Sequence, residues 1–529
     1  MFDLAGKTRS GVQTAYTRIV LTRFGVIFIL LTLIHCFAQG ALQVSLYVGD
    51  ARASSLLDRI VGAAELPASG ISWLQSLGNG NYTLKFCTNI PIAAGGPESC
   101  VTVYQTGADD AVVSTKDVDL DARGFATDML VRRTFTADDV SPSLNASGGI
   151  VGVNLTYQGT GDKVQSVVLS EQCTRSLVYA DEIMGEYKKQ DAALLGLQFW
   201  LLILSFVAIL YSSIPQISAV ICTRVLSTAW ASYEIYATRR HESLFHTLFA
   251  EPDTPCNLDL FPTHFKTRLA LTIADLVLNV TALLFTVALG RLLIKNFKEY
   301  AFQRVGPPRS IIRIYRFFLS IFVLLQLSVF FLVTAVALWT TWLLNGPLLH
   351  ISLHTPIYKA LFVFTIVSLP PWIVMGWYAV RRELRLLMAG FMVVSFIYIA
   401  CWSIMFYSQV YRWTFINWVF FASMTVLSFV VLVLTTVFGA LCWLNFGKGL
   451  AQYLDAEATL AKANFTPEVF PQEETVTKVS DVLSDDKTLS FGTVKQDINR
   501  DIYDVDQAPI IVIGLQNGDG TLQRDTNDV

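Results

Sequence analysis

Residues 415–443 read FINWVFFASMTVLSFVVLVLTTVFGALCW, a run of apolar and small polar side chains without any acidic or basic residue. About 20 such residues in an α-helix are enough to cross the hydrocarbon core of a bilayer. Five more apolar runs precede it, at 192–213, 268–292, 314–344, 356–380 and 386–409. Only 15% of the 529 residues are charged, whereas soluble domains carry about 25%. The sequence therefore predicts a multi-pass membrane protein and argues against a soluble globular one.

Charge is distributed unevenly along the chain. Residues 1–191 have a formal net charge of −4, residues 192–445 of +9, and residues 446–529 of −8. A basic excess confined to the hydrophobic part is typical of short loops at an anionic cytoplasmic leaflet, not of a nucleic-acid surface. We therefore expect the lipid bilayer as a partner and no nucleic acid.

The N-terminus carries a targeting signal. Residues 1–23 hold four basic residues and one acidic residue, which predicts a basic cytoplasmic segment. Residues 24–48 are mostly apolar and predict a signal anchor, the first transmembrane helix. Small residues at 38–40 leave a cleaved signal peptide as the alternative. Both interpretations place the residues that follow outside the cell or in the secretory lumen.

Residues 49–190 have a different composition, polar and rich in Gly, Ser and Thr. Short stretches such as 82–86 and 150–155 alternate apolar and polar side chains, which indicates β-strands. Glycosylation sequons begin at Asn81, Asn145 and Asn154. We predict an extracellular, glycosylated, β-sandwich-like domain.

The topology depends on residues 216–236, which are mostly apolar but contain Arg224 and Glu234. If this segment stayed on the membrane surface, ten basic residues at 291–316 and 381–385 would be exported, against the positive-inside rule. If it crosses, those ten become cytoplasmic and only four basic residues at 239–268 are exported. We therefore expect seven transmembrane helices over 191–445, in an all-α bundle that follows the signal anchor or signal peptide.

The same topology places four cysteines outside: Cys87, Cys100, Cys173 and Cys256. An even number of exported cysteines can all pair. We predict one disulfide between Cys87 and Cys100 across a hairpin. A second, between Cys173 and Cys256, would tether the ectodomain to the bundle. A free thiol at Cys256 is the alternative.

Residues 446–529 are acidic, poor in aromatic side chains and rich in Ser and Thr beside carboxylates. This composition predicts a disordered cytoplasmic tail, which could bind a cytoplasmic partner. At the membrane end, residues 445–450 read NFGKGL and are followed by Tyr453 and Leu454. This short run resembles the juxtamembrane end of uncharacterised multi-pass membrane proteins of filamentous fungi. The resemblance implies a fungal membrane protein and brings no activity with it.

A polar site is expected inside the bundle. Asp275 and Asn279 lie one helical turn apart in an apolar run, where a carboxylate is costly unless it is paired or hydrated. A cation or proton site is one interpretation, with Arg224 or Glu234 of the preceding helix as partners. We favour the structural alternative, in which an Arg224–Asp275 pair holds two neighbouring helices together.

Histidines suggest a second, weaker hypothesis. His241, His246, His264, His350 and His354 fall in the two loops that the topology places outside. Imidazoles from two loops could bind zinc or copper at the membrane surface. Loop histidines without a metal are commoner, and we expect no cofactor.

The sequence contains no phosphate-binding loop, zinc-protease motif, nucleophile elbow or dinucleotide turn, so an enzyme is unsupported. We expect a receptor-like or sensor protein of the plasma membrane or secretory pathway, with an unknown extracellular ligand or protein partner. The alternatives are a transporter or channel that uses the polar site, and a non-catalytic membrane scaffold. A cavity from the outer face to Asp275 would favour transport, and a closed bundle with an outer pocket would favour a sensor. A solid bundle under a flat ectodomain would favour a scaffold.

Overall fold

The computed structural model describes residues 23–67, 70–78, 80–91, 100–107, 140–144, 146, 149–158, 164–210, 213–252, 254–261, 263–302, 309–345 and 355–448. Several expectations concern residues outside these ranges. They are the N-terminal segment before residue 23, the tail from residue 449 onward, Asn145, His350 and His354.

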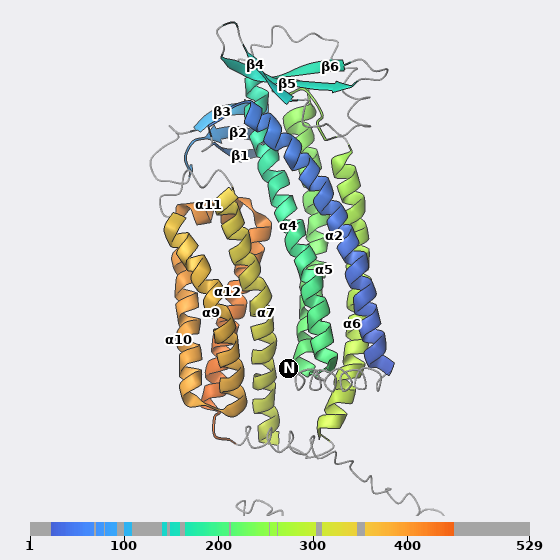
Figure 1. Cartoon of the computed structure of the whole chain (residues 1–529), viewed down its shortest axis with the longest axis vertical. Helices are drawn as coiled ribbons and strands as arrows, with labels where there is room; N and C mark the ends of the chain where they lie inside the picture. The colour runs from blue at the N-terminus through green and yellow to red at the C-terminus, as the bar shows by residue number, and fades with distance from the viewer. Residues whose placement is uncertain are drawn as a thin grey trace, which may run out of the picture. The chain divides into compact units, whose positions relative to one another are not determined.

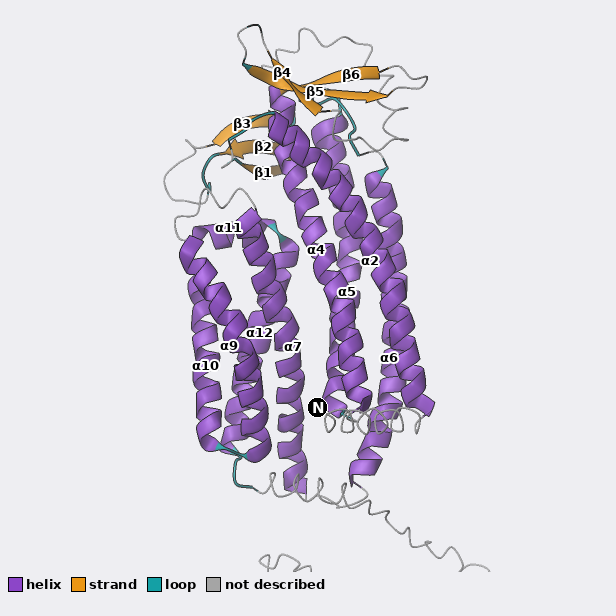
Figure 2. Ribbon diagram, in the orientation of Figure 1, coloured by secondary structure: helices purple, strands orange, loops and turns teal. Residues whose placement is uncertain are grey.

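Helices dominate the described chain (Figures 1 and 2). They are α2 (Arg23–Ala63), α4 (Glu171–Leu210), α5 (Ile214–Phe245), α6 (His264–Phe302), α7 (Arg309–Asn345), α9 (Thr355–Arg382), α10 (Arg385–Met405), α11 (Gln409–Asn417) and α12 (Val419–Leu444). Seven of them are long and apolar enough to cross a membrane, namely all except α5 and the short α11. The described chain is therefore compatible with a membrane helical bundle. The seven candidate spans are α2 and six later helices, and α5, which contains the segment at 216–236 that was expected to cross, is not among them.

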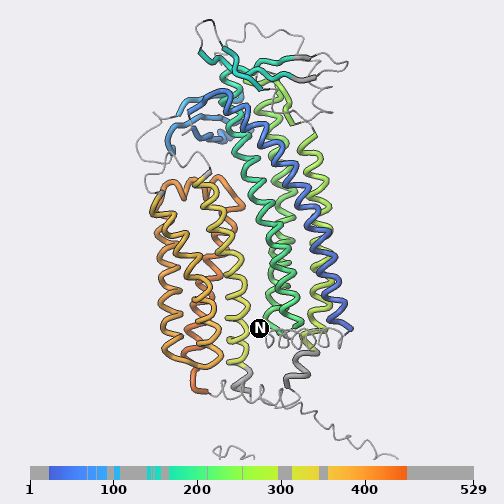
Figure 3. Tube along the Cα trace, in the orientation of Figure 1, coloured from blue at the N-terminus to red at the C-terminus, as the bar shows by residue number. Residues whose placement is uncertain are grey.

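The long helices form two groups. α2, α4, α5 and α6 pack on one another as the first helix group, and α7, α9, α10 and α12 form the second. Figure 3 shows α2, from the start of the chain, lying beside α4 and α6. α5 packs against α4 and α6 and leads the chain back to the end of the bundle where the strands lie. α5, which contains the segment at 216–236, thus packs within the first helix group and also against α7 of the second.

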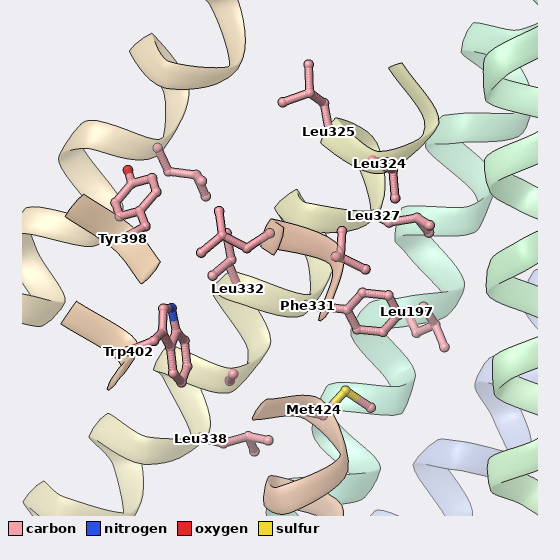
Figure 4. Packing of buried hydrophobic residues seen from close by; sticks show 14 of the residues in the cluster. Leu197, Leu324, Leu325, Leu327, Phe331, Leu332, Leu338, Tyr398, Trp402 and Met424 are labelled. Carbon is pink, nitrogen blue, oxygen red and sulfur yellow. The ribbon is translucent and has the colours of Figure 1, made fainter. Parts of the chain in front are cut away.

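Leucine and aromatic side chains join the two groups (Figure 4). Phe331 and Leu332 of α7, Trp402 of α10 and Met424 of α12 belong to one buried cluster, which also includes Leu197 of α4. Association of helices in lipid depends on close van der Waals packing more than on exclusion of water. α7 is therefore the helix through which the second group holds the first.

Two small antiparallel sheets lie at one end of the helices (Figure 2). One has the order β1 (Ile71–Gly78), β2 (Asn81–Cys87), β3 (Cys100–Gln105), and the other the order β4 (Val140–Leu144), β5 (Ile150–Gln158), β6 (Val164–Ser170). The alternating stretches at 82–86 and 150–155 lie within strands β2 and β5, as predicted.

The two sheets do not form the expected sandwich, because helices supply their cores. Leu57 of α2 and Leu177 of α4 are buried together with Val153 of β5. Val178 of α4 is buried with Phe86 of β2 in a smaller cluster. A three-stranded sheet has one apolar face to cover, and here α2 and α4 extend beyond their apolar runs and cover it.

Both predicted disulfides are present in the structure. One joins Cys87 to Cys100, which are opposite each other in the β2–β3 pair. The other joins Cys173, at the start of α4, to Cys256, in the connection between α5 and α6. Asn81 is exposed where β2 begins, whereas Asn154 is half-buried within β5. Glycosylation of these asparagines stays a prediction.

Candidate functional site

A buried arginine, Arg268 near the start of α6, is the centre of a charged cluster in the first helix group. Its guanidinium donates hydrogen bonds to Asp50 of α2, to Asp191 of α4 at 3.2 Å and to Glu234 of α5 at 2.7 Å. All four side chains are at most 3% exposed. A planar guanidinium has five N–H donors, so one arginine can serve several carboxylates. Arg268 thus joins its own helix to the three others of the group.

The four charged residues share a position in the sequence. They mark the sheet-proximal ends of the apolar runs at 24–48, 192–213, 216–236 and 268–292, in the order Asp50, Asp191, Glu234 and Arg268. Neighbouring helices run in opposite directions, so these ends meet at one level (Figure 1). Burial of a charge away from water is costly unless the charge is paired, and here each carboxylate is bound to the guanidinium of Arg268, whose single positive charge is shared among the three.

Aromatic and imidazole side chains enclose the cluster. The guanidinium carbon of Arg268 lies 3.9 Å from the ring centroid of Tyr187, within cation–π range. His264 Nε2 is 3.3 Å from a carboxylate oxygen of Asp50, and the Tyr187 hydroxyl is hydrogen-bonded to His241 Nδ1. Burial, together with two nearby arginines, lowers the pKa of His241 to about 4. The imidazole of His241 is therefore neutral at pH 7 and can accept a hydrogen bond from the Tyr187 hydroxyl.

Asp275 is the centre of a second polar group, further along α6. It accepts hydrogen bonds from the side-chain amides of Gln39 and Gln43 of α2 and from Asn279 Nδ2, the last at 2.9 Å. Ser227 of α5 donates to Asn279 Oδ1 at 3.1 Å. This group confirms that Asp275 and Asn279 share one helix face, and it satisfies the carboxylate with neutral amides.

The predicted Arg224–Asp275 pair is wrong. Arg224 Nη1 instead lies 3.2 Å from His35 Nδ1 of α2, and Glu234 is bound to Arg268. The physical reason is the register between α5 and α6: Glu234 meets Arg268 and Ser227 meets Asn279, so Asp275 lies opposite residues between 227 and 234, and Arg224 lies beyond them. The four residues expected in one polar site lie in three separate groups.

Polar residues of α2 contribute to all three groups. The spacing of these residues in the sequence could have indicated that they face other helices. Thr32, His35, Gln39, Gln43 and Asp50 are all buried. They are spaced by three, four or seven residues, which places them on one face of the helix. A polar face within an apolar run is a sign that the face is turned toward protein.

A pocket of about 650 Å³ lies beside the cluster. It is lined by α2 from Ser45 to Arg59 and by residues from Leu260 to Leu271 in the connection to α6 and its first turns. Asp50 and Arg268 are both in its wall. The cluster therefore lies directly behind the pocket wall, with Asp50 and Arg268 themselves almost fully buried.

The described histidines do not gather into a metal site. His241 faces Tyr187, His264 faces Asp50, and His246 Nδ1 is 3.7 Å from a carboxylate oxygen of Glu251. In the ranges that the structure describes, no three His, Cys, Asp or Glu side chains are arranged to hold a metal ion.

Compared with protein-family models, curated proteins and solved structures, the chain gives no match. The function is therefore argued from the cluster and the pocket alone.

Replacement of Asp275 tests the second polar group. In Asp275→Leu the buried amides of Gln39 and Gln43 lose their acceptor, whereas Asn279 Nδ2 keeps the backbone oxygen of residue 275, and each unsatisfied group costs about 1–3 kcal/mol. We expect a loss of at least about 2 kcal/mol in thermal unfolding of the purified full chain. Asp275→Asn keeps a carbonyl oxygen and should lose less. Equal stability of the leucine variant and the wild type would contradict the group's structural role.

Proposed function

We propose that the chain is a receptor-like protein of the plasma membrane or of a secretory-pathway membrane, with the pocket between α2 and α6 as its ligand site. One observation carries the proposal. Arg268 lines the pocket together with Asp50, while it also holds Asp191 of α4 and Glu234 of α5. A ligand that moved Arg268 would change the contacts of four helices at once, which is the differential contact that a conformational response needs.

The proposal places the sheet end of the bundle outside. α5 then crosses as an additional span, which its packing against α4 and α6 supports. The basic residues at 291–316 and 381–385 face the cytoplasm, in agreement with the positive-inside rule. The exposed Asn81 and both disulfides face the compartment where glycosylation and disulfide formation occur.

The packing of α2 supports a retained signal anchor over a cleaved signal peptide. His35 and Gln39 lie before or within the cleavage motif at 38–40, and both are bonded to side chains of other helices. Cleavage there would remove partners of Arg224 and Asp275 from the interior of the first helix group.

A transporter or channel is the second candidate, because the polar face of α2 continues from Asp50 through Gln43 and Gln39 to His35. The pocket, however, is lined only as far as Ser45 and Leu271, and Asp275 is not in its wall. A pocket at the sheet end whose wall does not include Asp275 fits a sensor better than a transport path.

Covalent filling of the pocket tests the receptor-like function without a known ligand. The four free cysteines, Cys36, Cys222, Cys401 and Cys442, are first replaced by alanine. Thr267→Cys, an exposed position in the pocket wall, is then modified on intact cells with a membrane-impermeant thiol reagent. We expect about tenfold faster amide hydrogen exchange in α4 and α5, which corresponds to about 1.4 kcal/mol of lost local stability.

Ser141→Cys is the matched control. Ser141 is exposed in β4, at the same end of the bundle as Thr267, but it does not line the pocket. It should be modified equally without altering α4 or α5. Exchange changes confined to α2 and α6 would refute the coupling, and lack of modification from outside would refute the orientation. Modification of Asn279→Cys by the same reagent would favour the transporter.

A further inference from the structure

We infer that the pocket between α2 and α6 binds an anionic phospholipid, with the phosphate at Arg52 and Arg59 and an acyl chain along the apolar wall. The inference rests on the proposed function, since it names the ligand class of the same pocket. Three features of the pocket support a phospholipid: its charges, its apolar lining and its position at the end of the apolar runs.

The charges of the pocket wall favour an anion. Arg52, Arg59 and Arg268 line it with a single carboxylate, Asp50. Arg52 and Arg59 are two helical turns apart and therefore lie on one face of α2. Among the described residues, neither forms an ion pair: Arg59 Nε donates to the backbone oxygen of Ser55 at 3.0 Å, within its own helix. The wall thus has two arginines whose charge is not neutralised.

Unpaired guanidinium nitrogens point to the same conclusion. Among the residues that the structure describes, Arg59 Nη1 and Arg268 Nε are buried without a hydrogen-bond partner. Burial of such a donor costs free energy unless a partner satisfies it. A phosphate presents several acceptor oxygens and is bound well by arginine. Asp191 and Glu234, which bind Arg268 from α4 and α5, are not in the pocket wall.

The remaining wall is suited to an acyl chain. Leu46, Leu56, Leu260, Phe261 and Leu271 supply its apolar side chains. Directly beyond this wall, α2 exposes Val44 and α6 exposes Ile273, both more than 40% accessible. In a membrane these surfaces face lipid, so a chain held at Leu271 continues into the bilayer. A soluble phosphate would use the arginines and leave the apolar wall empty.

Lipid retention tests the inference. The full chain is reconstituted in nanodiscs of phosphatidylcholine alone or mixed with phosphatidylglycerol, and retained lipid is measured by native mass spectrometry. The wild type should keep phosphatidylglycerol in preference to phosphatidylcholine. The double variant Arg52→Gln/Arg59→Gln should hold it about thirtyfold more weakly, which corresponds to about 2 kcal/mol for two arginines near an anionic head group.

The matched control is Arg239→Gln/Arg240→Gln, which removes two exposed charges at the same end of the bundle but outside the pocket. It should retain lipid like the wild type. Equal retention of both lipids, or equal loss in the two double variants, would overturn the inference. So would stabilisation by inorganic phosphate that matches the effect of phosphatidylglycerol, because the ligand would then be a soluble anion.

The inference and the proposed function can fail separately. The covalent test at Thr267→Cys uses no lipid ligand and reports only whether a filled pocket alters α4 and α5. Selective lipid retention without such coupling supports the lipid site and contradicts the receptor-like function. A change in α4 and α5 without selective lipid retention supports the receptor-like function and contradicts the lipid site.

Discussion

Arg268→Met is expected to remove most of the folded protein from the membrane. Arg268 is the shared partner of three buried carboxylates, and the variant leaves them in the interior without a guanidinium. Loss of one partner of a buried ion pair costs about 3–5 kcal/mol, and here three carboxylates lose their partner together. A domain is stable by only about 5–15 kcal/mol, so the loss is large. Fluorescence-detected size-exclusion chromatography of the tagged full chain measures the folded fraction.

Two control variants test whether the loss is due to the unpaired carboxylates. Arg291→Met removes an exposed arginine of the same helix and should leave the folded fraction unchanged. Adding Asp191→Asn and Glu234→Gln to Arg268→Met should restore part of it, because neutral side chains no longer need the guanidinium. If Arg268→Met and Arg291→Met fold equally well, the cluster does not hold the first helix group together.

The apolar runs predicted the seven helices that are long and apolar enough to cross a membrane, but not where those helices end. The run at 192–213 belongs to α4, but α4 already begins at Glu171. The run at 24–48 belongs to α2, but α2 continues to Ala63. Outside lipid a helix does not need continuous apolar sequence, so these extensions give no hydropathy signal. They are the reason that helices cover the two sheets where a sandwich was expected.

The charged cluster could not be predicted from the same reasoning. Asp50, Asp191 and Arg268 each resemble an ordinary charge at the end of a span, which normally faces head groups and water. These charged side chains face the interior only because the four helices pack together at the level where their apolar runs end. The predicted partner of Asp275 was wrong for a related reason: sequence places Arg224 on the neighbouring helix but does not give the register between the two helices.

The disulfide between Cys173 and Cys256 is expected to stabilise the fold more than the one between Cys87 and Cys100. Its two cysteines are separated by 83 residues, against 13 for the other pair. In the chain-entropy model a disulfide restricts the unfolded chain more when it closes a longer loop. We expect losses of about 4–5 kcal/mol for Cys173→Ala/Cys256→Ala and about 3 kcal/mol for Cys87→Ala/Cys100→Ala.

The longer loop also contains parts of the cluster. It includes most of α4, with Asp191, and all of α5, with Glu234, and Cys256 precedes Phe261 and His264 of the pocket wall. Opening this disulfide should therefore expose the cluster region to hydrogen exchange, in addition to lowering the unfolding temperature. Opening the Cys87–Cys100 disulfide, which joins two paired strands, should affect only the first sheet and its contacts. Alkylation of Cys256 in the unreduced wild type, or a larger loss from the shorter loop, would show that this disulfide does not secure α4 to the start of α6.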